Sequence, residues 1–141
     1  MSRFLIVDDD ADIRLLLRLA LGAEGHDITE AEHGGAAIAC LDTDPPDLVL
    51  LDLMMPVVDG WEVLRSMGSR EDGPGVVAIT ALASHDQRHL VEVLEAGAVD
   101  VVAKPFDIEW LVELVGQLAT ADATERAAHR AGRLAAARGE R

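Results

Sequence analysis

The sequence predicts an α/β domain built on a five-stranded parallel sheet, and two observations predict it. Four runs of three or four apolar residues each stop at a polar residue, which is typical of strands buried on both faces of a parallel sheet. These runs are 4–7, 48–51, 76–79 and 101–103. Segments with helical spacing alternate with the runs, as in βαβ units. The chain has 141 residues, half of them hydrophobic, which fits one small domain with a sizeable core.

In the first half of the chain, the strand at 4–7 leads into a helix over residues 11–21. The apolar positions 13, 16, 17, 20 and 21 follow helical spacing, and Asp10 is the predicted N-cap. Residues 22–25 end this helix, and 26–31 form a weaker second strand. An alanine-rich helix over 34–41 stops before the Pro45-Pro46 pair. The strand at 47–51 then runs directly into Asp52.

In the second half, a helix is predicted over 60–67, followed by a turn at 71–75 and the strand at 76–79. The next helix spans 84–96 and ends at Gly97, which suits a helix C-terminus. After the short strand at 101–103, the last helix of the body covers 107–118, with Asp107 as its N-cap.

The residues that follow the strands are suited to phosphoryl chemistry. They are Asp8, Asp9, Asp52, Thr80 and Lys104. In an open α/β sheet the ligand site lies outside the carboxyl ends of the strands, so these residues are expected to converge. Together they can hold a divalent cation and a phosphoryl group. Lys104 is the single lysine among twelve basic residues, so a compact ammonium is kept at this position alone.

Charge and composition narrow the possible partners and the compartment. The net charge of −14 argues against nucleic acid and anionic membranes as partners of the bulk surface. A single cysteine, Cys40, cannot form an internal disulfide, and no leader or membrane-spanning apolar run is present. These features predict a cytoplasmic protein with no membrane contact.

The charge is unevenly distributed and marks a boundary near Ala119. Residues 1–119 carry 7 basic and 23 acidic residues, a net charge of −16, whereas residues 120–141 carry 5 arginines and 3 acids, a net charge of +2. The body is therefore predicted as 1–119. The extension 120–141, rich in alanine and arginine, is expected to be helical or disordered, and a mobile terminal extension is the favoured interpretation. It is too short for a helix-turn-helix output domain.

Four motifs, taken together and in order, resemble the receiver domain of bacterial two-component response regulators. They are Val7-Asp8-Asp9-Asp10, the segment from Leu51-Asp52 to Asp59-Gly60, Thr80-Ala81, and Gly97-Ala98 followed by Lys104-Pro105-Phe106. The resemblance covers about residues 3–119. It implies a doubly wound, flavodoxin-like (βα)5 fold with strand order 2-1-3-4-5.

The resemblance implies a role for each site residue. Asp52 would accept a phosphoryl group from a histidine kinase or phosphotransfer protein, becoming an acyl phosphate. A Mg²⁺ cofactor would be held by Asp8, Asp9, Asp52 and the carbonyl of Met54, because a hard cation relieves the repulsion between carboxylates. Thr80 would donate its hydroxyl to a phosphoryl oxygen. Ala81 would leave room for the phosphoryl group, and Lys104 would pair with its oxygens.

Four further residues resemble structural positions of the family. Pro105 matches the position of a cis peptide that turns Lys104 into the site, while Pro56, Asp59 and Gly60 shape the loop after Asp52 and start the next helix. The implied function is a stand-alone response regulator, not a turnover enzyme, that signals to a downstream protein without direct nucleic-acid contact. A homodimer through the face formed by helix 84–96, strand 101–103 and helix 107–118 is one arrangement the resemblance raises.

Two departures from the family pattern concern switching and the lifetime of the phosphorylated form. Three residues before the lysine, where the family usually carries Tyr, Phe or His, this chain has Val101. The family's usual phosphorylation switch pairs the threonine with this aromatic ring, and the ring is therefore missing here. Met54 and Leu82, which border the site, are apolar where many relatives are polar.

Two alternative functions stay open from the sequence. The Asp8-x-Asp10 pattern after an apolar strand imitates the nucleophile motif of haloacid-dehalogenase-like phosphohydrolases, but no acidic pair follows Lys104 and no cap domain is evident. The other alternative is a receiver-like interaction module with little phosphorylation-driven switching, which Val101 keeps open. Phosphorylation of Asp52, of Asp8 or of neither residue distinguishes the three.

Overall fold

The fold is a five-stranded parallel sheet, as expected. The computed structural model describes residues 1–54, 60–68, 73–81 and 87–139. The strands are β1 (Arg3–Val7), β2 (Asp27–Ala31), β3 (Leu48–Asp52), β4 (Gly75–Thr80) and β5 (Asp100–Ala103). They pair in the order β2-β1-β3-β4-β5, all parallel, which confirms the predicted topology.

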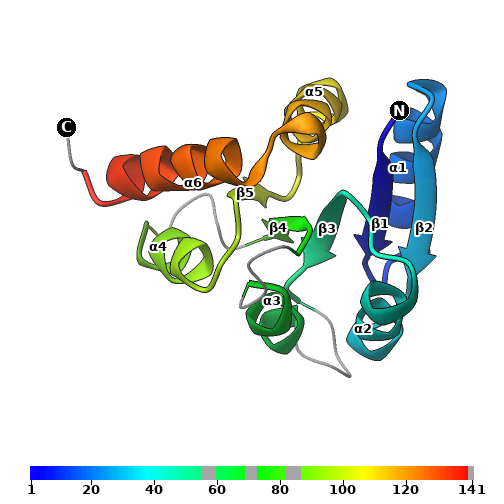
Figure 1. Ribbon diagram of the computed structural model, residues 1–141, viewed down its shortest axis with the longest axis horizontal. Coiled ribbons are helices and arrows are strands. Elements are labelled where there is room, and N and C mark those ends of the chain that lie inside the picture. Colours follow the sequence, from blue (N-terminus) through cyan, green and yellow to red (C-terminus); the bar gives the residue numbers. More distant parts are fainter. Residues whose placement is uncertain (55–59, 69–72, 82–86, 140–141) are drawn as a thin grey trace.

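Helices cover both faces of the sheet (Figure 1). They are α1 (Ala11–Ala23), α2 (Gly34–Thr43), α3 (Gly60–Gly68), α4 (Gln87–Glu95), α5 (Ile108–Thr120) and α6 (Ala123–Ala137). The helices α1 and α5 lie on one face, and α2, α3 and α4 lie on the other. The two hydrophobic clusters follow this division, because alternate strand residues point to opposite faces. In β1, for example, Leu5 belongs to one cluster and Ile6 to the other.

The central strands are fully buried because both of their faces are covered. All residues of β3 and β4 are buried, which explains their near-continuous aliphatic sequence. The predicted N-caps also form. The side chain of Asp10 accepts a hydrogen bond from the Asp12 N–H, and that of Asp107 accepts one from the Trp110 N–H. Of the apolar positions with helical spacing in α1, Leu17 and Leu21 are buried, whereas Leu16 is exposed.

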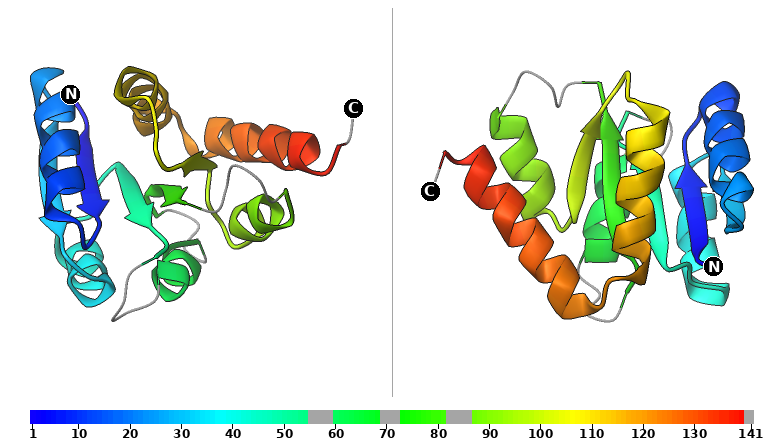
Figure 2. Two further views of the ribbon diagram at one scale, coloured as in Figure 1. Left: turned by 180° about the vertical axis from the view of Figure 1, so that it is seen from behind. Right: turned by 90° about the horizontal axis from the view of Figure 1, so that it is seen from above.

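The carboxy-terminal extension forms the helix α6 rather than a mobile tail. Asp122 and Glu125 make a reciprocal capping box that starts α6 after a short break at residues 121–122. The helix lies against α4 and the edge strand β5, as both orientations in Figure 2 show. It therefore covers part of the face formed by α4, β5 and α5 through which a homodimer was considered.

Among the residues described, no helix combines the length and the apolar character needed to cross a bilayer.

Candidate functional site

Three aspartates meet at the carboxyl edge of the sheet. Asp8 follows β1 directly and Asp52 ends β3, and these strands are paired with Val7 opposite Leu51. One carboxylate oxygen from each of Asp8, Asp9 and Asp52 lies within 4.8 Å of the others. Asp8 and Asp52 are 1% and 3% exposed, whereas Asp9 is exposed to solvent. The predicted acidic cluster therefore forms, with two buried carboxylates and one at its mouth.

Backbone N–H groups fix the two buried carboxylates. The N–H of Asp10 donates to Oδ1 of Asp8 at 2.9 Å, and the N–H of Met54 donates to Oδ1 of Asp52, also at 2.9 Å. In each case the donor lies two residues after the aspartate, so the chain turns around its own carboxylate. The Met54 side chain is 59% exposed at this point.

Lys104, which directly follows β5, contacts both buried carboxylates. Its Nζ lies 3.1 Å from Oδ2 of Asp8 and 3.4 Å from Oδ2 of Asp52. Burial alone would lower the pKa of the Lys104 ammonium, but the negative charges of Asp8 and Asp52 outweigh burial and raise it. The ammonium therefore stays charged. The peptide bond from Lys104 to Pro105 is cis, as the resemblance implied.

The Asp8 carboxyl has a perturbed proton affinity. Burial raises its pKa, the hydrogen bond from the Asp10 N–H lowers it, the charge of Asp52 raises it, and Lys104 lowers it. The net effect is a raised pKa, because burial and the second carboxylate outweigh the stabilising partners. The two carboxylates are thus held together at an electrostatic cost, which a bound cation would relieve.

Thr80 and Ala81 lie at the end of β4, next to β5. Thr80 is fully buried, and its carbonyl accepts a hydrogen bond of 3.1 Å from the Lys104 N–H. Thr80 also pairs with Ala103 across the two strands. Ala81 follows in an exposed turn. The hydroxyl-bearing residue and the ammonium-bearing residue are therefore connected through the backbone.

The loop after Asp52 comes very close to the start of α3. A Cβ atom added at Gly60 would lie 2.6 Å from the Asp52 carbonyl oxygen and 2.6 Å from Cα of Leu53. No side chain can be placed there without a shift of the backbone that carries Asp52. Pro56 and Asp59, as well as Leu82, lie outside the described residues.

One contact at the site was not predicted from the sequence. Nη1 of Arg14 donates to the Asp8 carbonyl oxygen at 2.7 Å, and Nε of Arg14 pairs with Glu30 at 3.3 Å. Arg14 lies four residues after the N-cap Asp10, so its position one helical turn into α1 was the available signal.

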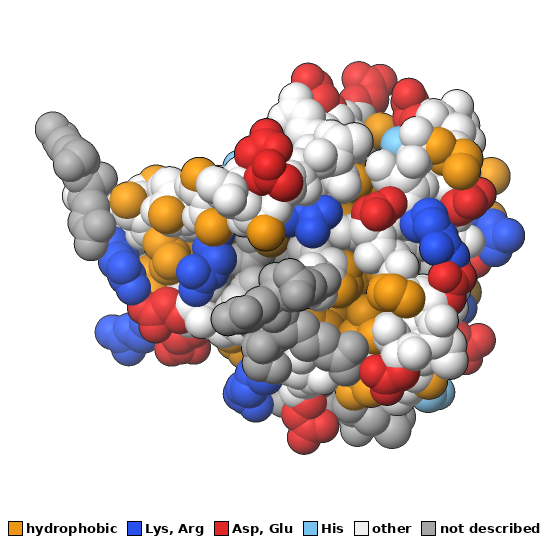
Figure 3. Space-filling model, in the orientation of Figure 1, with side chains coloured by type: hydrophobic (Ala, Val, Ile, Leu, Met, Phe, Trp, Pro, Cys, Tyr) orange, Lys and Arg blue, Asp and Glu red, His pale blue; other side chains and the backbone are white. Residues whose placement is uncertain are grey.

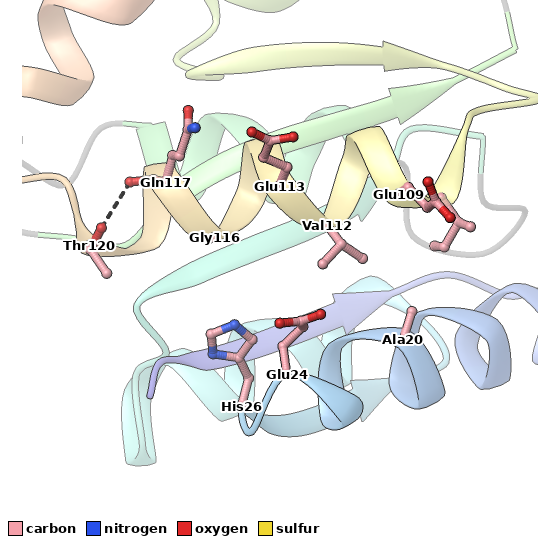
Figure 4. A pocket seen from close by; sticks show the side chains of 10 residues that line it. Ala20, Glu24, His26, Glu109, Val112, Glu113, Gly116, Gln117 and Thr120 are labelled. Atoms are coloured by element: carbon pink, nitrogen blue, oxygen red, sulfur yellow. Dashed lines mark hydrogen bonds between the residues drawn. The ribbon is translucent and has the colours of Figure 1, made fainter.

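A groove between α1 and α5 lies away from this cluster. It has a volume of about 720 Å³, and Glu24, His26, Val112, Glu113 and Gln117 are among its lining residues (Figure 4). None of the aspartates of the cluster, nor Lys104, lines it. The chemistry described above therefore belongs to the carboxyl edge of the sheet.

The donor set at that edge fits a hard divalent cation. Carboxylate and carbonyl oxygens are the ligands that Mg²⁺ prefers, and the cluster offers oxygens from three aspartates around one point. Asp10 does not join the cluster as a ligand pair with Asp8, because its side chain caps α1. The site combines an acidic cluster that fits a cation with the ammonium of Lys104, a combination suited to binding a phosphoryl group.

Comparisons with known proteins agree with this geometry. The family profile of the response regulator receiver domain matches residues 4–116. The response regulator MprA of Mycolicibacterium vanbaalenii is 41% identical over 110 residues, covering 78% of this chain and 47% of that protein. MprA of Mycobacterium avium is 40% identical with the same coverage. The chain thus spans about half the length of these relatives.

Solved structures show the same fold. The receiver domain of the Francisella response regulator 1452 superposes with a TM-score of 0.78 at 29% identity, covering 84% of this chain and 97% of that one. The response regulator TrrA from Thermotoga maritima, in complex with Mg²⁺-BeF, has a TM-score of 0.72 at 36% identity, covering 84% and 99%. On the profile match, the relatives and the fold, the chain belongs to the family of response regulator receiver domains.

Proposed function

We propose that this receiver domain accepts a phosphoryl group on Asp52 in a Mg²⁺-dependent reaction. The observation that carries the proposal is the buried Asp52 carboxylate, which lies beside Asp8 and Asp9 and 3.4 Å from the Lys104 ammonium. The protein shields the buried Asp52 carboxylate from bulk water, and the Lys104 ammonium provides a positive charge beside it. Both features favour attack on a negatively charged phosphoryl donor.

In the proposed transfer, an oxygen of the Asp52 carboxylate attacks the phosphorus atom of a phosphohistidine. The phosphorus–nitrogen bond breaks, its electron pair returns to the imidazole, and an acyl phosphate forms on Asp52. A Mg²⁺ ion held by Asp8, Asp9, Asp52 and the Met54 carbonyl would supply charge neutralisation. Lys104 would bind the phosphoryl oxygens, and the Thr80 hydroxyl would donate to one of them.

An apolar surface next to the site would suit the phosphodonor protein. Ile13, Leu16, Lys104, Pro105 and Phe106 line a pocket of about 350 Å³ that borders the site through Lys104. Leu15 and Leu19 on the same helix are also largely exposed. Large exposed aliphatic side chains beside a reactive group are typical of a protein docking surface. A histidine kinase or phosphotransfer protein that docks here would bring its histidine to Asp52.

The domain would act as a phosphorylated signalling protein of the cytoplasm that turns over no substrate of its own. Within these residues, output would pass through contact with another protein, because an acidic surface disfavours direct binding to nucleic acid. Acidic side chains are indeed spread over the face shown in Figure 3. The stand-alone mode of action stays a prediction, since the match covers only 47% of the MprA relative.

The test is intact mass and peptide mapping after incubation with acetyl phosphate, with and without Mg²⁺. We expect one acid-labile phosphoryl group on Asp52, dependent on Mg²⁺ and absent from Asp52→Asn. The matched control is Asp10→Asn, an acid in the same loop that caps α1 instead of joining the cluster. Phosphate on Asp8 would favour the phosphohydrolase alternative, and a chain that stays unmodified would favour the interaction module.

A further inference from the structure

A guanidinium of helix α1 holds the backbone of the loop that carries Asp8 and Asp9. Arg14 is the fourth residue of α1, and its Nη1 donates to the Asp8 carbonyl oxygen at 2.7 Å. Side chains of a helix lean toward its N-terminus, so a long side chain at this position can reach back over the first turn to the end of β1. The Arg14 side chain is only 13% exposed, so this contact belongs to the packed structure rather than to the mobile surface.

Glu30 of the edge strand β2 holds Arg14 in turn. Nε of Arg14 lies 3.3 Å from Oε1 of Glu30, and the other oxygen of Glu30 accepts from Arg18 at 2.6 Å. The next residue of β2 is Ala31, whose carbonyl accepts a hydrogen bond of 3.2 Å from the Asp8 N–H. The end of β1, the first turns of α1 and the end of β2 are therefore tied together at Asp8.

The Asp8 carbonyl shares a peptide plane with the start of Asp9. Because the peptide group is planar, the direction of the Asp8 C=O fixes the direction of the Asp9 N–H and the position of the Asp9 Cα. Asp9 is the exposed member of the acidic cluster. Within the part of the chain that the structure describes, nothing donates a hydrogen bond to its carboxylate, whereas the carboxylates of Asp8 and Asp52 each accept one from a backbone N–H. The orientation of the Asp9 side chain therefore depends on its backbone.

We propose that Arg14 is a positioning residue for the cation, because it fixes the Asp8–Asp9 peptide and thereby presents Asp9 in the geometry that Mg²⁺ requires. The inference rests on the Mg²⁺-dependent function proposed above. A guanidinium suits this task, since its rigid planar fork binds the Asp8 carbonyl and the Glu30 carboxylate at the same time. Arg14 is not itself a ligand, because a guanidinium has no acceptor atom. It acts through the chain that carries two of the ligands.

The charge of Arg14 by itself would have the opposite effect on a cation. A positive group beside the cluster repels Mg²⁺, so its removal would tighten Mg²⁺ binding if charge alone mattered. Loss of positioning would weaken Mg²⁺ binding instead, and groups that orient metal ligands typically contribute about 10–100-fold to affinity. The direction of the change in Mg²⁺ affinity therefore distinguishes the two effects.

The test is a Mg²⁺ titration of the full chain, followed by the amide chemical shifts of residues 8–10 and 52–54. Arg14→Gln should weaken Mg²⁺ binding by at least about tenfold relative to wild type. The matched control is Arg18→Gln, which removes the same charge from the same helix but makes no contact with the Asp8 carbonyl. This control should bind Mg²⁺ as wild type does or slightly more tightly. Binding by Arg14→Gln that equals or exceeds that of the control would overturn the proposal.

Selectivity between two cations provides a second readout on the same variant. Mg²⁺ demands near-ideal octahedral geometry, whereas Ca²⁺ accepts more ligands in a flexible arrangement. Arg14→Gln should therefore lose more affinity for Mg²⁺ than for Ca²⁺, so that the ratio of the two dissociation constants shifts toward Ca²⁺. An equal loss for both ions would show that Arg14 does not set the geometry of the ligands, and the proposal would be wrong.

A second pair of variants tests the proposal even if Arg14→Gln does not fold. Glu30→Ala removes the anchor of Arg14 and keeps the arginine, whereas Glu32→Ala removes an exposed acid two residues later. Both variants lose one negative charge, which weakens cation binding through charge alone. Glu30→Ala should weaken Mg²⁺ binding further, because Arg14 is then held less firmly. Equal Mg²⁺ affinities for the two variants would contradict the positioning role.

The positioning role and the proposed function fail in different ways. If wild type binds no Mg²⁺, the proposed function is wrong and the positioning role falls with it. If wild type binds Mg²⁺ and Arg14→Gln binds it equally well, only the positioning role of Arg14 is wrong.

Discussion

At the scale of single residues, the site depends on one ammonium between two carboxylates. Nζ of Lys104 is 3.1 Å from Asp8 and 3.4 Å from Asp52, so it balances the charge that the two acids share. When Asp52 carries a phosphoryl group, the same ammonium can follow the new oxygens. Its compact shape and flexible stem permit this movement.

The first prediction concerns Lys104→Arg, which keeps the charge and changes its shape. A planar guanidinium presents a rigid fork and does not fit the place of a compact ammonium between Asp8 and Asp52. We expect the thermal midpoint to change by no more than about 2–4 °C, and the structural response to phosphorylation to be blunted. The measurement is amide exchange before and after acetyl phosphate. A response equal to that of wild type would show that any cation suffices at this position.

The second prediction concerns Asp8, whose pKa is raised chiefly by burial. A carboxyl with a higher pKa in the folded than in the unfolded state destabilises the fold as pH rises from the unfolded toward the folded value, and the loss persists above it. Asp8→Asn should therefore raise the melting temperature at pH 7 without divalent cation. The gain should shrink at acidic pH, where Asp8 is protonated in both states.

Thermal melts across pH, with and without Mg²⁺, check this expectation. Mg²⁺ should stabilise wild type more than Asp8→Asn, because the variant has lost one ligand. A variant that melts below wild type at every pH would show that the hydrogen-bonding role of Asp8 exceeds its charge penalty.

The third prediction concerns the lifetime of the phosphorylated form. Met54 lies two residues after Asp52 and is largely exposed, and Leu82 lies two residues after Thr80. Neither side chain can orient a water molecule for in-line attack on the acyl phosphate. Met54→Asn with Leu82→Glu should accelerate dephosphorylation roughly tenfold, or about 1.4 kcal/mol in the barrier. The decay of phosphoprotein after donor removal measures the rate, and an unchanged decay would place control of water elsewhere.

At the scale of elements, the start of α3 fixes the loop that carries Asp52. The fourth prediction is that Gly60→Ala costs about 1–3 kcal/mol and slows phosphorylation, because its Cβ would lie 2.6 Å from the Asp52 carbonyl oxygen. The control is Gly116→Ala in α5, where a Cβ meets nothing within 4 Å. This control should gain up to about 1 kcal/mol from helix propensity. Denaturant unfolding compares them, and equal effects at both positions would contradict the close approach.

The body elements could be predicted from the sequence, because strand and helix signals alternate and each apolar run ends at a polar residue. Convergence of Asp8, Asp52 and Lys104 followed from topology alone. For the extension 120–141 the sequence left a helix and a disordered segment as alternatives, since α6 has a single large aliphatic residue, Leu134. Arg130 and Arg133 of α6 bind the Leu94 carbonyl and Asp100, which lie more than thirty residues away in the sequence. Local hydrophobic periodicity cannot reveal such long-range contacts. The capping pair Asp122 and Glu125 was the one local signal available.

At the scale of the whole molecule, charge acts in two opposite directions. The body has a net charge of −16 and repels itself, whereas the extension carries +2 and is attracted to the body. Salt screens both effects. Repulsion within the body and attraction of α6 are therefore expected to weaken together as ionic strength rises.

The fifth prediction follows from this opposition. Raising NaCl from about 0.01 M to about 0.15 M shortens the screening length from about 30 Å to about 8 Å. The melting temperature of the body should rise, while exchange of the α6 amides should become faster, by roughly twofold for each weakened ion pair. Calorimetry and amide exchange on one sample separate the two effects. If both quantities move in the same direction, α6 is not held mainly by charge.

The strand β5 links the site to α6 mechanically. Lys104 follows its last residue, and Asp100 is its first. The four residues of β5 span about 13 Å and are already extended, so a displacement along the strand at one end is expected to reach the other end at about the same size. Helix α6 is about 22 Å long, and Asp100 contacts it near its middle through His129 and Arg133. A tilt of about 10° around that contact would move each tip by roughly 2 Å, enough to break a hydrogen bond there. A small axial shift of the Lys104 ammonium is therefore expected to displace the ends of α6 sideways.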